Sequence, residues 1–184
     1  LRSVLPPYGA RGKIYFEYAV PRLGRRIDVV LLIDHVIFVV EFKVGEKEFA
    51  TSAIDQVVDY SVDLKNFHET THDKTVAPIL IPTLAKSGSA VIATTPQNDG
   101  VLLPVCAAVK DFECVIEQVL AFTSGSSIQA AQWDEGRYRP TPTIIEAAMA
   151  LYAGHGVAEI SRSDACAVNL SETSSVVARI IQDA

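Results

Sequence analysis

Three side chains capable of chemistry interrupt two strongly apolar segments near the start of the chain. Asp28 lies in "RRIDVVLLI", and Glu41 and Lys43 lie in "VIFVVEFKV". Glu41 and Lys43 are two residues apart, so in a β-strand they point to the same face. Carboxylates held together beside an apolar sheet repel each other unless a proton, a cation or a metal neutralises them. Oxygen ligands of this kind suit Mg²⁺, and the neighbouring ammonium could orient a water or stabilise charge on phosphorus.

The turn between the two segments decides whether these residues meet. Only Asp34–His35 separates them, which predicts a tight two-residue hairpin. In that register Asp28 lies opposite Glu41 and Arg26 lies opposite Lys43, with directly opposed Cβ atoms about 5 Å apart. The sequence therefore predicts a site for phosphodiester hydrolysis, and the alternative is that these charges are only the solvated end of a hairpin.

Hydrophobic periodicity predicts the elements that must position these residues. A helix is expected from Ser52, which would form a capping box with Asp55, to about Phe67. A third helix would start at Pro142, and Ser171 would cap a last one. The remaining expected elements are strands at 13–20, 25–33, 36–44, 76–82 and 90–95 and a helix at 110–122.

"RRID", "EFK" and "QVVDY" occur in that order and together resemble the PD-(D/E)XK nuclease superfamily, in particular its RecB-type QxxxY branch. The resemblance implies an α/β fold with a restriction-endonuclease-like central mixed sheet flanked by helices, and here with a C-terminal helical extension. It also implies that Asp28 and Glu41 bind Mg²⁺ or Mn²⁺. Lys43 would be the catalytic lysine, and Gln56 and Tyr60 the helical pair, one turn apart on the same side of the helix.

A wider resemblance extends over nearly the whole chain. "FEYAVPR", "RRIDVVLL", "VVEFKVG", "DQVVDYSVDLKNFH" and "YRPTPTIIEAA" are similar to a family in which a nuclease-like domain precedes a Schlafen-type, helicase-like P-loop ATPase. This resemblance implies a nuclease-like domain at 1–130 and a helical linker at 131–184. The linker would lead toward a C-terminal ATPase domain, which would be the partner of this domain.

The superfamily usually opens with a helix that often adds another acidic residue, and only "LRSVLPPYGARG" precedes the first strand here. If the first turn is centred between Arg22 and Leu23, Glu17 would pair across from Asp28 and could compensate. Glu17 is equally well read as a charge at the edge of a strand.

Charge and composition restrict the possible partners. The net charge is −6, which argues against a protein that simply coats nucleic acid. Residues 11–28 nevertheless hold five basic and two acidic side chains, so Arg22, Arg25 and Arg26 are either phosphate contacts or a solvated rim. No apolar segment is long enough to span a membrane, and three unpaired cysteines indicate a reduced, cytoplasmic protein.

"HETTH", from His68 to His72, has the spacing of a helical zinc peptidase motif. Asp73 and Lys74 follow at once, so the motif would lie where a helix ends, and no third ligand stands at a recognisable spacing. We expect both histidines at the surface and His35 in a turn. The predicted function is thus a metal-dependent nuclease acting on DNA or RNA. The alternatives are an inactive nuclease-fold module that binds nucleic acid and, more remotely, a zinc peptidase.

Overall fold

Five strands form one mixed sheet in the order β1-β2-β3-β4-β5. The structure is a computed structural model that describes residues 1, 4–21 and 23–138. β1 (Gly12–Val20), β2 (Arg25–Ile33) and β3 (Val36–Lys43) pair antiparallel, whereas β4 (Thr75–Pro82) and β5 (Val105–Cys106) continue the sheet in parallel. The expected α/β class with a mixed sheet flanked by helices is confirmed.

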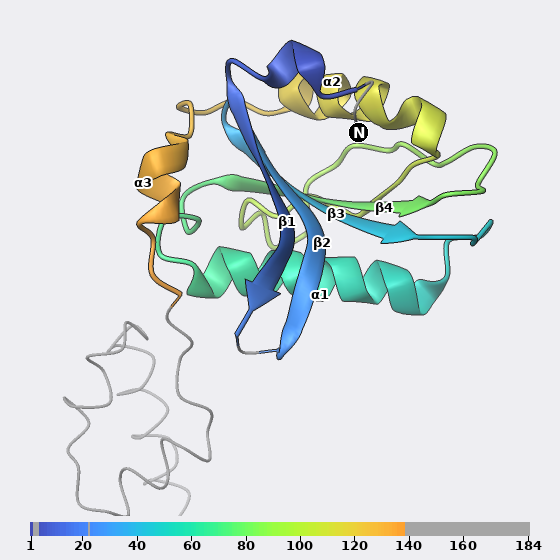
Figure 1. Cartoon of the computed structure of the whole chain (residues 1–184), viewed down its shortest axis with the longest axis horizontal. Coiled ribbons are helices and arrows are strands. Elements are labelled where there is room, and N and C mark those ends of the chain that lie inside the picture. The colour runs from blue at the N-terminus through green and yellow to red at the C-terminus, as the bar shows by residue number, and fades with distance from the viewer. Residues whose placement is uncertain (2–3, 22, 139–184) are drawn as a thin grey trace, which may run out of the picture. The chain divides into compact units, whose positions relative to one another are not determined.

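Helices cover both faces of this sheet (Figure 1). α1 (Thr51–Phe67) connects the parallel strands β3 and β4 and packs on one face, and α2 (Phe112–Phe122) packs on the other. Short 3₁₀ turns occur at Pro6–Tyr8 and Val109–Asp111, and α3 is the single-turn helix Ala130–Asp134. Residues Leu1–Tyr138 form one unit. The helices expected at Pro142 and Ser171 and the remainder of the expected 131–184 linker lie outside the described residues.

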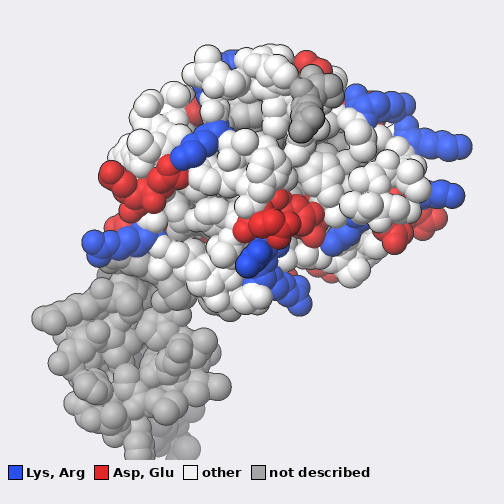
Figure 2. All heavy atoms as spheres, in the orientation of Figure 1, with Lys and Arg blue, Asp and Glu red and all other residues white. Residues whose placement is uncertain are grey.

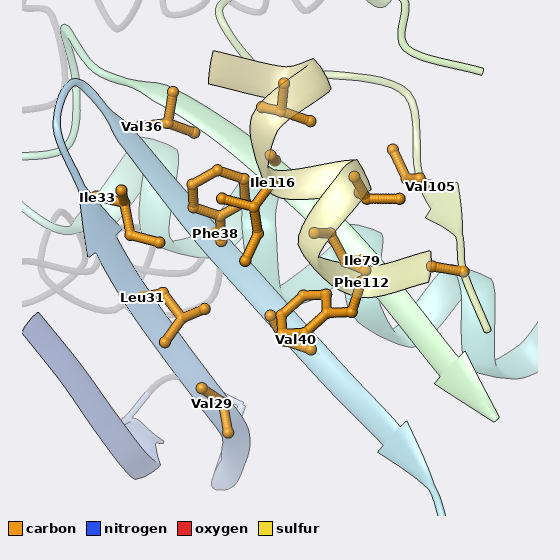
Figure 3. Packing of buried hydrophobic residues seen from close by; sticks show 14 of the residues in the cluster. Val29, Leu31, Ile33, Val36, Phe38, Val40, Ile79, Val105, Phe112 and Ile116 are labelled. Carbon is orange, nitrogen blue, oxygen red and sulfur yellow. The ribbon is translucent and has the colours of Figure 1, made fainter. Parts of the chain in front are cut away.

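Strand β3 is apolar on both sides because a helix covers each of them. All five residues of Val36–Val40 are fully buried, as expected for a central strand. Figure 3 shows one of the two cores, in which Phe112 and Ile116 of α2 lie over Phe38 and Val40 of β3. Each such side chain contributes about 1.5–3 kcal/mol when it is withdrawn from water, so β3 is held firmly up to the polar end that carries Glu41.

Most strand and helix predictions are confirmed, and two details are wrong. Helix α1 begins at Thr51 with Ala50 as the N-cap and makes no side-chain cap hydrogen bond, so the expected Ser52–Asp55 capping box does not form. Segment 90–95 is not a strand. The position beside β4 is taken by residues 101–106, and segment 90–95 meets them only through an isolated bridge between Thr94 and Leu102.

The hairpin between β2 and β3 closes at Asp34–His35, as predicted, with Asp34 in the left-handed region at a φ of 50°.

Within residues 1, 4–21 and 23–138, no helix has the length and apolar character needed to cross a bilayer.

Candidate active site

The site lies where strands β2 and β3 separate. Their ladder runs from Ile33↔Val36 to Val29↔Val40, in the predicted register. At the next position the Phe42 backbone N–H donates to Asp28 Oδ2 at 2.8 Å. A carboxylate therefore replaces the backbone carbonyl, and beyond it the β1–β2 hairpin turns toward α1 while β3 runs on beside β4 (Figure 1). The ladder ends at Val29↔Val40, so neither the expected Asp28–Glu41 pair nor the expected Arg26–Lys43 pair is part of it, and the prediction of direct cross-strand pairing is wrong for both.

Both strands of the β1–β2 hairpin change faces at this same level. Tyr15 and Tyr18 both pack on the α1 side, although strict alternation would place residues three apart on opposite faces. Between them, Glu17 adopts a φ of 49°. In β2, the first and last residues of Ile27–Val30 also both pack on the α1 side, although they too are three apart. Asp28 lies between them. Left-handed backbone at a residue other than glycine costs about 1–2 kcal/mol, and such strain often accompanies functional sites.

Glu41 is the most deeply buried of the three predicted residues. Its residue exposure is 3%, and its Oε1 accepts hydrogen bonds from Lys43 Nζ and Gln56 Nε2, both at 2.9 Å. Its Oε2 is also buried and makes no hydrogen bond with any residue that the structure describes. An unsatisfied buried carboxylate oxygen is costly, so this atom is the clearest sign of a missing ligand.

The pKa of Glu41 is raised above its usual value. Burial is the main cause, and the charge of the neighbouring Asp28 acts in the same direction. The hydrogen bond and charge of Lys43, and least of all the backbone N–H of Asp28, favour the ionised form. Asp28 thus lies close enough to Glu41 to contribute to its raised pKa, although the β2–β3 ladder does not pair the two residues directly.

Helix α1 supplies the other side of the site. Gln56 Oε1 accepts from Lys43 Nζ at 2.9 Å, and Gln56 Nε2 donates to Glu41 Oε1 and to Tyr60 Oη at 2.9 Å each. The amide thus presents its oxygen to the ammonium and its NH₂ group to the carboxylate. Tyr60 is 2% exposed and anchors Gln56 from one turn further along. Hydrogen bonds therefore connect four of the five predicted residues into one group, and the fifth, Asp28, is held next to it by the Phe42 backbone N–H.

The residues of this group fit a hard divalent cation. Mg²⁺ is usually held by one or two carboxylates, with waters and substrate phosphate completing its shell. Here one oxygen, Glu41 Oε2, is buried without a partner, and Asp28 Oδ1 makes no hydrogen bond within the described part of the chain. In that same part, no group of three or more His, Cys, Asp or Glu side chains that could hold a metal ion is found. Two carboxylates are thus the anionic contribution that the described residues make here.

Glu17 does not complete the site. The predicted register is confirmed, because the pairs Phe16↔Val29 and Tyr18↔Ile27 place Glu17 opposite Asp28. Its side chain is exposed, and no three-carboxylate group is formed among the described residues. The acidic residue that an N-terminal helix would add is therefore not replaced from β1.

The arginines near the site are only partly described. Arg25 and Arg26 are exposed at the start of β2, and Arg22 lies outside the described residues. The face in Figure 2 carries basic and acidic side chains in small mixed groups separated by uncharged surface, with no continuous basic band. Any nucleic-acid contact on this face would be local.

The HETTH segment packs against Trp133 through its first histidine. Helix α1 ends at Phe67, so His68 is a C-cap with extended backbone and the motif is not helical. His68 is 2% exposed and its ring stacks on Trp133 at a centroid distance of 4.3 Å. The prediction of a surface position is wrong for His68, since Trp133 covers it. It is confirmed for His72, which is exposed.

Hydrogen bonds make His68 a poor zinc ligand. Trp133 Nε1 donates to Thr71 Oγ1 at 3.0 Å, and the same hydroxyl group forms a hydrogen bond with His68 Nδ1 at 2.9 Å. Burial is the main cause that lowers the pKa of His68 to about 4, and the nearby His72 adds to it. His72 Nδ1 donates to the Lys65 carbonyl at 2.9 Å. The geometry of a helical HExxH site is therefore not present.

Sequence reasoning missed how these side chains are connected. Neither the bond from Phe42 N–H to Asp28 nor the bridging of Lys43 and Glu41 by Gln56 follows from a pattern of residue types. The burial of Trp133 was also missed, although it is the only tryptophan of the chain and a tryptophan beside a polar loop is a usable signal.

Comparisons with protein-family models, with curated proteins and with solved structures find no match for this chain.

Proposed function

We propose that this chain is a metal-dependent nuclease of the PD-(D/E)XK type, with a restriction-endonuclease-like fold, that hydrolyses phosphodiester bonds of DNA or RNA. The observation that carries the proposal is Glu41 Oε2, which is buried beside the like-charged Asp28 and has no hydrogen-bond partner among the described residues. A bound cation satisfies this oxygen and removes the repulsion at the same time.

Asp28 and Glu41 would hold Mg²⁺ or Mn²⁺. The ion would supply charge stabilisation for the phosphate and a water that ionises more readily. Phe42 N–H fixes one Asp28 oxygen, and the other would be a ligand of the ion. The β3 backbone thereby orients the carboxylate before substrate arrives, which is the preorganisation that electrostatic catalysis needs.

Lys43 would act on the reacting phosphate. An ammonium has three N–H donors, and two of them are directed to Glu41 Oε1 and Gln56 Oε1. One donor remains for a phosphate oxygen or the attacking water. Because Lys43 is partly exposed, with 28% of its side chain accessible, this donor can reach a substrate that approaches from solvent.

Gln56 and Tyr60 would be positioning residues. Gln56 sets the distance between Lys43 and Glu41 by bonding to both, and Tyr60 fixes the Gln56 amide. We further propose that Arg25 and Arg26, with Arg22, contact the phosphate backbone. Coupling to a helicase-like ATPase domain and a cytoplasmic location complete the proposal.

A second candidate is a nuclease-fold module that binds nucleic acid without cutting it. Two observations favour it: only two carboxylates meet at the site among the described residues, and the face in Figure 2 lacks a continuous basic band. A pure binding module, however, gains nothing from a buried carboxylate oxygen without a partner.

The test is cleavage of fluorescent single- and double-stranded DNA and RNA by the purified chain, with Mg²⁺ and with excess chelator. We expect cutting that requires the metal and falls by at least about 10²-fold in Glu41→Gln and in Lys43→Met. His72→Ala, at an exposed position outside the site, is the matched control and should cut normally. Salt-sensitive binding without cleavage under every condition would favour the second candidate, and equal cutting with and without chelator would refute metal dependence.

A further inference from the structure

Two loops continue from the carboxyl ends of strands β3 and β4, directly beyond the candidate site. The strands end together, with Lys43 opposite Pro82, and both run toward the same side in Figure 1. Thr83 N–H donates to the Lys43 carbonyl at 3.0 Å, and Leu84 N–H donates to the Glu46 carbonyl at 2.9 Å. We call residues 44–46 and 83–84 together the ledge.

The ledge is held in a fixed conformation. Gly45 adopts a φ of 82°, which only glycine takes readily, and its N–H donates to Thr83 Oγ1 at 2.9 Å. Glu46 N–H closes the turn onto the Lys43 carbonyl at 3.3 Å. Side chains on the ledge are therefore presented by hydrogen-bonded backbone, as expected for a preorganised contact surface.

Apolar side chains point into solvent from both halves of the ledge. Val44 is 85% exposed and Leu84 is 54% exposed. A single exposed apolar residue is ordinary. Here two occur on loops that are bonded together, and one of them directly follows Lys43 in the chain. Apolar surface at this place costs solubility without contributing to the core, so a contact with substrate is a reasonable cause.

The charges around the ledge favour one mode of contact. Glu46 is exposed and is the one charged residue of the ledge itself, and the flanking Lys47, Glu48 and Lys86 are exposed as well. Acidic side chains repel phosphates, so a strand whose phosphate lies at Lys43 would turn its phosphates away from the ledge and its bases toward it. Aliphatic groups cannot read the hydrogen-bonding edges of bases, but they can press on base faces and unstack them.

We propose that Val44 and Leu84 form an apolar wedge that contacts the bases next to the scissile phosphate, so that the preferred substrate is nucleic acid whose bases are unpaired there. The inference rests on the proposed function and specifies its substrate class. Fully paired duplex would have to be unstacked before it fits, which costs free energy at each base step. Single strands avoid most of that cost.

The experiment compares KM and kcat for one oligonucleotide sequence, single stranded and fully paired, in wild type and in Val44→Ser combined with Leu84→Ser. We expect wild type to prefer the single strand, and the double variant to raise its KM about tenfold with kcat little changed, equivalent to about 1.4 kcal/mol. Val91→Ser is the matched control, because Val91 is 64% exposed on a different loop. All the substitutions are at exposed positions, and thermal melts confirm folding.

Binding separates failure of the wedge from failure of the proposed function. Fluorescence of 2-aminopurine in the same oligonucleotide, with Ca²⁺ in place of Mg²⁺, should rise on binding to wild type and rise less with the double variant. Normal cleavage by wild type with an unchanged KM in the double variant would overturn the wedge alone, and would leave the ledge as a contact for another protein. An equal loss on paired and single-stranded substrates would also overturn it. Absence of both cleavage and binding in wild type would overturn the proposed function and the wedge with it.

Discussion

Two familiar motifs occur in this chain, and the fold brings the residues of one together but separates the residues of the other. Asp28, Glu41 and Gln56 are distant in sequence, yet strand register and helix position bring them together near Glu41 Oε2, which has no hydrogen-bond partner in the part of the chain that the structure describes. His68 and His72 are neighbours in sequence, yet one is buried under Trp133 and the other is exposed. The difference shows that the spacing of residues in a sequence predicts a site only when those residues belong to a regular helix or strand.

The largest effect should come from the packing side of this comparison. Trp133→Ala removes the ring that stacks on His68 and lies against Tyr15 and Tyr18 at centroid distances of 4.9 and 5.3 Å. We expect a loss of about 3–5 kcal/mol in the free energy of unfolding, measured by urea denaturation followed by circular dichroism. Trp133→Phe should lose less. A cost below about 1 kcal/mol would mean that α3 does not stabilise this core.

Acid should weaken the same region through His68. Its folded-state pKa is about 4, below the ordinary value of about 6.5, so the unfolded chain binds the proton more readily. Stability is therefore full above pH 6.5 and falls as the pH drops toward 4, by about 3 kcal/mol in total. His68→Asn, which keeps a hydrogen-bonding side chain next to Thr71, should flatten this dependence, and His72→Ala, which removes only a smaller contribution to the lowered pKa, should flatten it much less. Identical pH profiles for wild type and His68→Asn would contradict the assignment.

The active-site side of the comparison predicts a smaller effect at Gln56. Gln56→Leu leaves the helix intact but removes the bonds to Lys43 and Glu41. We expect kcat to fall about 10–100-fold, the usual cost of losing a group that orients catalytic ligands, with KM little changed. Gln56→Glu, which keeps an acceptor for Lys43 but repels Glu41, distinguishes the two bonds. Full activity in Gln56→Leu would show that the amide does not position the site.

The smallest expected effect is on the free energy of unfolding when Glu41 is replaced, and here we expect no loss of stability. The raised pKa of Glu41 means that the folded protein holds this proton more tightly than the unfolded chain does. That contribution to stability is lost as the pH rises through the folded pKa. Glu41→Gln should therefore unfold with a free energy at pH 8 equal to wild type or about 1 kcal/mol higher, in contrast to the loss of cutting that we expect from it. A marked destabilisation, seen in urea titrations without metal, would indicate a structural role.

Much of the architecture could be predicted from sequence, because continuous apolar segments and tight turns are local signals. The Asp34–His35 turn fixed the β2–β3 register, and the turn after Val20 fixed the position of Glu17 opposite Asp28. Three features could not be predicted: the face switch at Glu17, the side-chain bond that ends the ladder at Asp28, and the burial of His68. Each depends on contacts between segments far apart in the chain, and no local periodicity records these contacts.

The most direct test of the central claim is the location of a bound divalent ion. A crystal soaked in Mn²⁺ and measured for anomalous scattering should show one peak at Glu41 Oε2 and the Asp28 carboxylate, with metal–oxygen distances of about 2.1 Å. The peak should disappear in Glu41→Gln. The absence of a peak at Asp28 and Glu41 at saturating Mn²⁺, or an ion bound at His68 and His72 in its place, would contradict the account.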